Sequence, residues 1–181
     1  MTQRSSLHAP FPVIAVVQIS LVYFLCFALS SLAGVLGNLG VPWPLRLLGI
    51  PLTAFGIGMI AWTFRFRGWR AIFESNYVTT RKLLRRQRLT DLAGRTEPLV
   101  VAGPYRLVRH PFYSGVEALT LGAAVLVDFP WAYFGAFVFW LWLTVVVAPF
   151  EERELVALFG TPYQEYMRTH RRFLPIPRRS R

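Results

Sequence analysis

Long uncharged stretches alternate with short basic stretches along this chain. No Asp, Glu, Lys, Arg or His occurs between Ala9 and Leu45, and three later runs are nearly as apolar. A helix of about 20 apolar residues is long enough to cross the hydrocarbon core of a bilayer. The pattern therefore predicts four membrane-spanning helices, at about 12–36, 45–64, 113–127 and 131–150.

The first apolar run has one alternative interpretation, a signal peptide. Its length exceeds the apolar region of about 7–15 residues that signal peptides carry, and residues 31–34 form only a weak cleavage site. We therefore expect this run to be a membrane span.

The connections between the apolar runs predict the topology. The segments GNLGVPWP (37–44) and DFP (128–130) read as short turns without basic residues, and the second is short enough to make an antiparallel hairpin of the third and fourth helices. Of the 20 Lys and Arg residues, all but Arg4 and Arg46 lie in the segments 65–112 and 151–181. Because basic segments stay inside, we expect both segments and both termini to be cytoplasmic.

Composition excludes several classes of protein. The chain is 54% hydrophobic yet has a formal net charge of +11, which suits basic segments such as 65–92 lying on anionic lipid head groups. A nucleic-acid-binding role for RKLLRRQR (81–88) does not explain the flanking spans. The single cysteine, Cys26, permits no internal disulfide, and three scattered histidines give no metal-ligand set. We expect neither a nucleic-acid partner nor a metal.

Candidate chemistry gathers where the third helix begins, in GPYRLVRHPFYSG (103–115). Pro111 suits the first position of a helix, and the free N–H groups of that turn, next to Arg109 and His110, favour an anion. The hairpin returns Glu151 and Glu152 to the same end of the bundle. Cationic groups from one helix and carboxylates from the next would suit a zwitterionic ligand such as S-adenosylmethionine.

The segments EPLVVAGPYRLVRHPFYSG (97–115) and EERELVALFGTPYQEYMRTHRRFLP (151–175) together resemble the isoprenylcysteine carboxyl methyltransferase family, which shares this core with the phospholipid methyltransferases. The resemblance covers residues 97–175. It implies a helical membrane methyltransferase that uses S-adenosylmethionine and has no Rossmann fold. Carried over by position, it implies a cofactor site made of Glu97, Pro98, Leu99, Val100, Tyr105, His110, Pro111, Phe112, Tyr113 and Glu151, and we expect Glu152 to take part as well.

Two positions depart from that family. The first segment usually begins with His or another polar residue, where this chain has Glu97. Members that methylate a prenylcysteine carboxylate carry an arginine four residues before the position of Glu151, where this chain has Val147. An arginine would pair with the substrate carboxylate through charge-assisted hydrogen bonds, and valine cannot.

Glu117 is a third point, because an ionisable residue within a membrane span is a functional candidate. It follows Tyr113 by one helical turn. The alternative is a structural pairing with Arg106, Arg109 or Arg153. We expect Glu117 and Arg109 to be the catalytic side chains, acting on an amine, a thiol or a neutral hydroxyl. Tyr163 and Tyr166 are either anchors at the membrane interface or part of a lid made by the C-terminal segment.

The sequence as a whole predicts one all-α domain over residues 1–181, a polytopic membrane bundle of about four spans with a C-terminal helical hairpin and a cytoplasmic cofactor pocket. We expect an S-adenosylmethionine-dependent methyltransferase resembling the isoprenylcysteine carboxyl methyltransferases, whose lipophilic or lipidated acceptor enters from the bilayer. Two alternatives stay open: a phospholipid N-methyltransferase, and a non-catalytic membrane scaffold.

Overall fold

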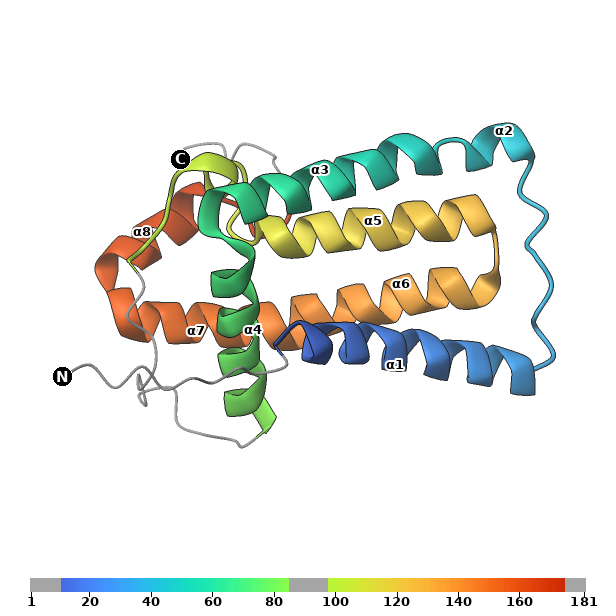
Figure 1. Ribbon diagram of the computed structural model, residues 1–181, viewed down its shortest axis with the longest axis horizontal. Helices are drawn as coiled ribbons and strands as arrows, with labels where there is room; N and C mark the ends of the chain where they lie inside the picture. The colour runs from blue at the N-terminus through green and yellow to red at the C-terminus, as the bar shows by residue number, and fades with distance from the viewer. Residues whose placement is uncertain (1–10, 85–97, 175–181) are drawn as a thin grey trace.

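The computed structural model describes residues 11–84 and 98–174, and the regular elements in this part of the chain are all helices (Figure 1). The predicted all-α fold is therefore confirmed. Four long helices lie side by side along the molecule: α1 (Phe11–Leu32), α3 (Gly49–Arg67), α5 (Pro111–Val127) and α6 (Pro130–Trp142).

Shorter elements gather at the two ends of these long helices. At one end lie α2 (Trp43–Arg46) and the turn between α5 and α6 (Figure 1). At the other end α4 (Trp69–Leu84) crosses the bundle. The remaining elements at that end are the 3₁₀ helix η1 (Gly103–Arg106), the π-helical segment η2 (Leu143–Val147), α7 (Ala148–Phe159) and α8 (Thr161–Thr169).

Helices stand at all four predicted places, and α5 and α6 form the predicted antiparallel hairpin. Within the described residues, two stretches are long and apolar enough to cross a membrane: Trp43–Arg67, with a mean hydropathy of 1.7, and Pro130–Phe159, with 1.9. The stretches Val16–Leu32 and Pro111–Val127 are apolar but shorter. The number of membrane crossings stays a prediction.

The predicted fourth helix is longer than expected, because α6, η2 and α7 follow one another without a break to Phe159. Pro149 lies just after the π-helical segment. A proline ring clashes with the carbonyl four residues earlier in a regular helix, and the wider π turn before it relieves that clash. The helical path ends at Gly160, which has a φ of 62°.

Glycines let α3 and α5 approach closely. A Cβ atom added to Gly56 would lie 2.5 Å from the backbone nitrogen of Leu119, and one added to Gly122 would lie 2.6 Å from the backbone nitrogen of Thr53. Small residues at such contacts bring helix backbones together in membrane bundles. The close contact fixes the start of α5 against the end of α3.

The hydrophobic core lies between α5 and α6. Its buried members are Tyr113, Val116, Phe139, Leu143 and Val147. Val147, the position where prenylcysteine-methylating enzymes have arginine, thus belongs to the packed core and lines neither of the cavities described below.

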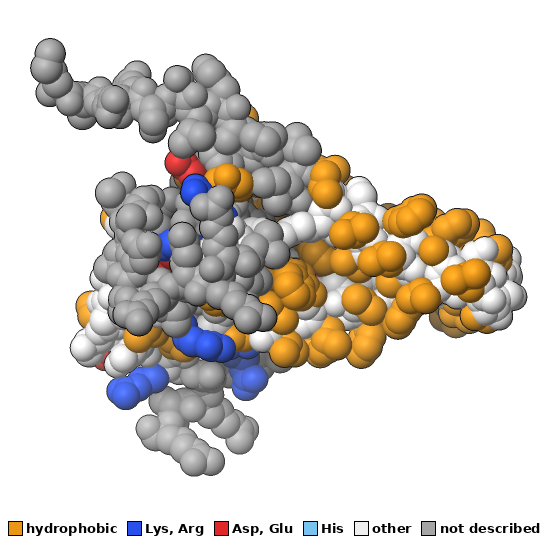
Figure 2. Space-filling model, turned by 90° about the horizontal axis from the view of Figure 1, so that it is seen from below, with side chains coloured by type: hydrophobic (Ala, Val, Ile, Leu, Met, Phe, Trp, Pro, Cys, Tyr) orange, Lys and Arg blue, Asp and Glu red, His pale blue; other side chains and the backbone are white. Residues whose placement is uncertain are grey.

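Charge separates along the bundle. Figure 2 shows hydrophobic side chains over the long-helix half and Lys and Arg side chains at the end that carries α4, α7 and α8. At the opposite end Asp128 is fully buried, and its Oδ2 lies 2.7 Å from Nη2 of Arg46 and accepts a hydrogen bond from the backbone N–H of Val41. This ion pair holds the α1–α2 connection against the α5–α6 turn.

Candidate active site

A cleft opens at the basic end of the bundle, where α5 begins. His110 is the N-cap residue of α5 and Pro111 its first residue, as predicted. Most of the predicted cofactor residues line this cleft, together with residues of α7 and α8: Pro98, Leu99, Val100, Tyr105, His110, Pro111, Phe112, Tyr113 and Glu151. Glu97 lies outside the described residues.

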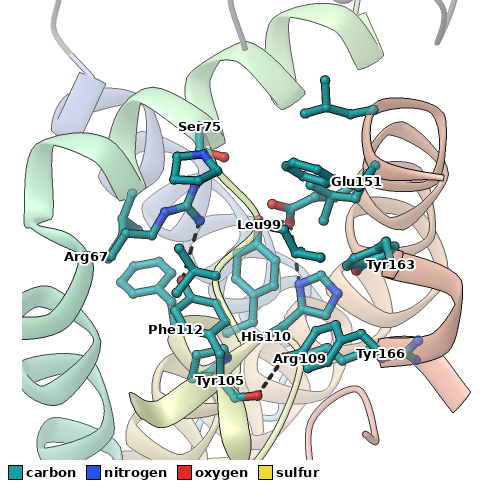
Figure 3. A pocket seen from close by; sticks show the side chains of 18 residues that line it. Arg67, Ser75, Leu99, Tyr105, Arg109, His110, Phe112, Glu151, Tyr163 and Tyr166 are labelled. Atoms are coloured by element: carbon teal, nitrogen blue, oxygen red, sulfur yellow. Dashed lines mark hydrogen bonds and ion pairs between the residues drawn. The ribbon is translucent and has the colours of Figure 1, made fainter. Parts of the chain in front are cut away.

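His110 joins α5 to α7. Its Nδ1 lies 3.5 Å from Oε2 of Glu151, and its Nε2 lies 3.2 Å from Oε1 of Glu152 (Figure 3). The imidazole also stacks on Tyr113, with ring centroids 5.4 Å apart. Burial alone would lower the pKa of His110, but the hydrogen bonds to the two carboxylates outweigh it and raise the pKa above its usual value.

The two adjacent carboxylates face different ways. Glu151 lines the cleft and accepts a hydrogen bond of 3.1 Å from the Tyr113 hydroxyl. Glu152 is 3% exposed and does not line the cleft. Its carboxylate binds Arg172 through Nη2 at 2.6 Å and Arg109 through Nη2 at 3.1 Å. Successive helical residues point about 100° apart, so only Glu151 of the two lines the cleft. Contact of either carboxylate with the cofactor stays a prediction.

The segment after α8 returns to the start of α5, and α8 itself lines the cleft. The backbone N–H of Arg109 donates to the carbonyl of Arg171, and that of His110 donates to the carbonyl of Arg172. Tyr163 and Tyr166 of α8 line the cleft and are 2% and 7% exposed, which is contrary to a role as interface anchors alone. Burial raises the pKa of both hydroxyls.

Three residues that line the cleft were not among the site residues predicted from the sequence. Arg67 ends α3, and Ile72 and Ser75 follow on α4; all three line the cleft. Figure 3 shows Arg67 and Ser75 across the cleft from Glu151 and Tyr163. The guanidinium of Arg67 donates to the Tyr105 hydroxyl at 3.5 Å. Ile72 and Ser75 reach the cleft because α4 turns across the bundle after Gly68, which has a φ of 81°.

The two predicted catalytic residues lead to a second cavity, which we name the side cavity. Glu117 lines this cavity of about 800 Å³ instead of the cleft, with residues of α3, α5 and α6 and with 171–174. Arg109 lines both spaces. Oε1 of Glu117 is buried and has no hydrogen-bond partner among residues 11–84 and 98–174, so the structural pairing with arginine is not what the structure shows.

A comparison with known families matches residues 45–162, which are 118 of the 181 residues, to phospholipid methyltransferases. The chain belongs to the phospholipid methyltransferase family. Members of this family use S-adenosylmethionine, which confirms the predicted enzyme class and cofactor and sets aside the non-catalytic scaffold. No curated protein and no solved structure matches the chain.

The family match distinguishes between the two methyltransferase families that the sequence resembles. The phospholipid methyltransferase domain shares its core with the isoprenylcysteine carboxyl methyltransferases, but membership of the latter family is not shown. The match therefore favours the alternative, a phospholipid methyltransferase that acts on a lipid, over the prenylcysteine-type enzyme. It ends one residue before Tyr163, so the place of the α8 tyrosines at the cleft rests on the structure.

The side chains of the cleft suit S-adenosylmethionine. Arg67 and His110 offer cationic groups for its carboxylate, and Glu151 offers an acceptor for hydroxyl or ammonium groups. The Tyr163 hydroxyl is buried and has no hydrogen-bond partner within the described segments. The walls enclose about 80 Å³, whereas small-molecule sites measure about 300–1,000 Å³. The space between these walls is therefore smaller than that of a typical small-molecule site.

Proposed function

We propose that this phospholipid methyltransferase transfers a methyl group from S-adenosylmethionine to the amine of a membrane phospholipid. The observation that carries the proposal is the convergence of His110 and Glu151, 41 positions apart in the chain, on one cleft at the end of an apolar bundle. The whole chain then acts as one membrane domain. The basic end that carries the cleft faces the cytoplasm, and the orientation with both termini cytoplasmic is in keeping with the positive-inside rule.

The cofactor supplies a methyl group that is already activated on a positively charged sulfur. The chain's own part is to hold the two reactants in line and to exclude water. Tyr113 and His110 orient the Glu151 carboxylate within the cleft. The buried rings of Tyr163 and Tyr166 cover the cleft from α8.

An amine fits the acceptor side better than a carboxylate does. Val147 is packed in the core, so no cation stands at the position that prenylcysteine-methylating enzymes use. Glu117 instead places a carboxylate in the side cavity. A negative charge attracts an ammonium group and repels a carboxylate, and the interaction is strong where water is scarce.

Calorimetry and a transfer assay test the proposal together. Wild-type protein in lipid nanodiscs is titrated with S-adenosylmethionine, and transfer of labelled methyl to phosphatidylethanolamine is then measured. Glu151→Gln removes the charge of the cleft carboxylate, and Glu165→Gln is the matched control on the exposed face of α8. A hydrogen bond to a charged group contributes about 1.5–3 kcal/mol, so we expect Glu151→Gln to weaken cofactor binding by roughly 10- to 150-fold.

The control should bind the cofactor as the wild type does. Equal affinity for Glu151→Gln and wild type would place the cofactor outside this cleft. A wild-type protein that binds the cofactor but methylates a prenylcysteine and no aminophospholipid would refute the proposed acceptor.

A further inference from the structure

The side cavity runs along the outside of α5, which lies between α3 and α6 (Figure 1). Its walls are mostly apolar, and several wall residues are also among the exposed hydrophobic side chains: Phe55 of α3, Leu121 of α5, and Phe137 and Trp140 of α6. In a membrane-spanning bundle such side chains face lipid. The cavity is therefore open toward the hydrocarbon of the bilayer.

Polar groups in this cavity gather at its basic end. Oε1 of Glu117 and Oγ1 of Thr144 are both buried, and neither has a hydrogen-bond partner in the part of the chain that the structure describes. A buried polar atom without a partner is costly. Thr144 belongs to the π-helical segment η2, and such segments are frequent at functional sites.

Arginines that line this cavity come from the C-terminal segment, which packs against the start of α5. Ser114 Oγ donates to the carbonyl of Phe173 at 2.8 Å, which fixes the C-terminal segment against α5. Glu117 follows Ser114 by three residues, about 4.5 Å along the helix. Arg171 lines the cavity with an exposed side chain, and Arg172 donates to the carbonyl of Thr144. The same apolar cavity thus presents a carboxylate on α5 and a guanidinium nearer the start of α5, since the carbonyl of Arg171 accepts a hydrogen bond from the backbone N–H of Arg109, eight positions before Glu117.

We propose that the side cavity binds the methyl acceptor, an aminophospholipid, with its ammonium group at Glu117, its phosphate at Arg171 and hydrocarbon along the apolar walls. This inference rests on the proposed function and adds the acceptor site to it. The charges are complementary, because the head group is a zwitterion whose cation can pair with the Glu117 carboxylate and whose anion can pair with the Arg171 guanidinium. Arg109 lines both the cleft and the side cavity, so the amine lies next to the space assigned to the cofactor.

Glu117 also acts as the base that deprotonates the ammonium group. An ammonium nitrogen has no lone pair and cannot be methylated. When its proton passes to the Glu117 carboxylate, an O–H bond forms, an N–H bond breaks and the electron pair stays on nitrogen. Proton transfer of this kind contributes about 10²- to 10⁴-fold to rate.

Three variants test the site in nanodiscs that contain phosphatidylethanolamine. Glu117→Gln should lower kcat at least about 100-fold, and Arg171→Gln should raise the KM for phosphatidylethanolamine about 10-fold, the effect of one charge-assisted contact. Leu121→Trp narrows the cavity and should raise the same KM. All three should bind S-adenosylmethionine with wild-type affinity.

Matched controls separate a local effect from a general one. Glu74→Gln removes an exposed carboxylate on α4, and Leu25→Trp adds an indole to the lipid-facing surface of α1; neither residue lines the cleft or the side cavity. Both should retain wild-type kinetics. With octadecylamine, which has no phosphate, Arg171→Gln and wild type should have the same KM.

Each failure has a distinct meaning. If the wild type methylates phosphatidylethanolamine while Glu117→Gln, Arg171→Gln and Leu121→Trp match its kinetics, the acceptor site is overturned and the proposed function stands. If the wild type binds the cofactor and methylates no aminophospholipid, the proposed function itself fails. An Arg171→Gln effect that persists with octadecylamine would overturn the assignment of the phosphate to Arg171.

Discussion

Replacing His110 by glutamine tests the charged contacts between α5 and α7. His110 is 6% exposed and lies 3.5 Å from a Glu151 oxygen and 3.2 Å from a Glu152 oxygen. These contacts raise its pKa, so the imidazole is protonated in the folded protein at pH values where a free histidine is already neutral. Glutamine keeps a hydrogen-bond donor but carries no charge.

The size of the effect follows from the two kinds of hydrogen bond. A bond to a charged group contributes about 1.5–3 kcal/mol and a neutral one about 0.5–1.5 kcal/mol. A group whose folded-state pKa is raised adds stability that is complete below its unfolded pKa, about 6.5 for histidine, and is lost as pH rises through the folded-state value. We therefore expect His110→Gln to be destabilised most at about pH 5.5, and less once the pH exceeds the raised pKa.

Thermal unfolding followed by tryptophan fluorescence measures this difference. Six tryptophans supply the signal, and each kcal/mol corresponds to a shift in Tm of about 2–4 °C for a chain of this size. Taking the difference between wild type and His110→Gln at each pH cancels the titration of groups that both proteins share. A difference that stays constant from about pH 5.5 to 9 would refute the charged state of His110.

Two further predictions concern packing and the placement of α4. Gly56→Ala places a Cβ 2.5 Å from a backbone nitrogen of α5 and should lower the free energy of unfolding by about 1–3 kcal/mol. The control Gly58→Ala meets nothing within 4 Å and should have the Tm of the wild type. Equal Tm values for the two variants would contradict the close approach of α3 and α5. Lys82→Met leaves the fully buried Glu154 carboxylate without its ammonium partner and should cost about 3–5 kcal/mol by denaturant unfolding, with the exposed Arg81→Met as the control. A Lys82→Met protein as stable as Arg81→Met would show that the ion pair does not hold α4 against α7.

The helices and the hairpin could be predicted because their causes are local. Length and apolar composition are enough to predict a helix that can cross a membrane. A turn as short as 128–130 makes the two helices that it joins pack against each other as an antiparallel pair. The start of α5 could also be predicted, since proline is favoured at the first position of a helix and Pro111 occupies it.

The far wall of the cleft could not be predicted, because its causes lie between distant parts of the chain. The direction of α4, which brings Ile72 and Ser75 to the cleft, depends on the bend at Gly68 and on the pairing of Lys82 with Glu154, 72 positions away. No local sequence pattern near Lys82 indicates that Glu154 is its partner.

The directions in which Glu151, Glu152 and Glu117 point could not be predicted either, for a different reason. Motif position suggested both Glu151 and Glu152 as cofactor ligands, yet one helix face can carry only one of two neighbours toward the cleft. Glu117 was expected near Tyr113, one turn away on the same helix. The structure directs Tyr113 to the cleft and Glu117 to the side cavity, which no helical spacing could have distinguished.

The wide turn at Leu143–Val147 has a consequence for how such a chain can diverge. A π-helical turn holds one residue more than a regular turn and closes the same full rotation, so losing a single codon there would restore a regular helix and leave α7 facing nearly the same way. Glu151 would still face the cleft and Glu152 would still face its arginines. The loss of one codon from a regular part of the same helix would instead rotate everything after it by about 100°, so this turn is where the chain can change length without disturbing the two glutamates.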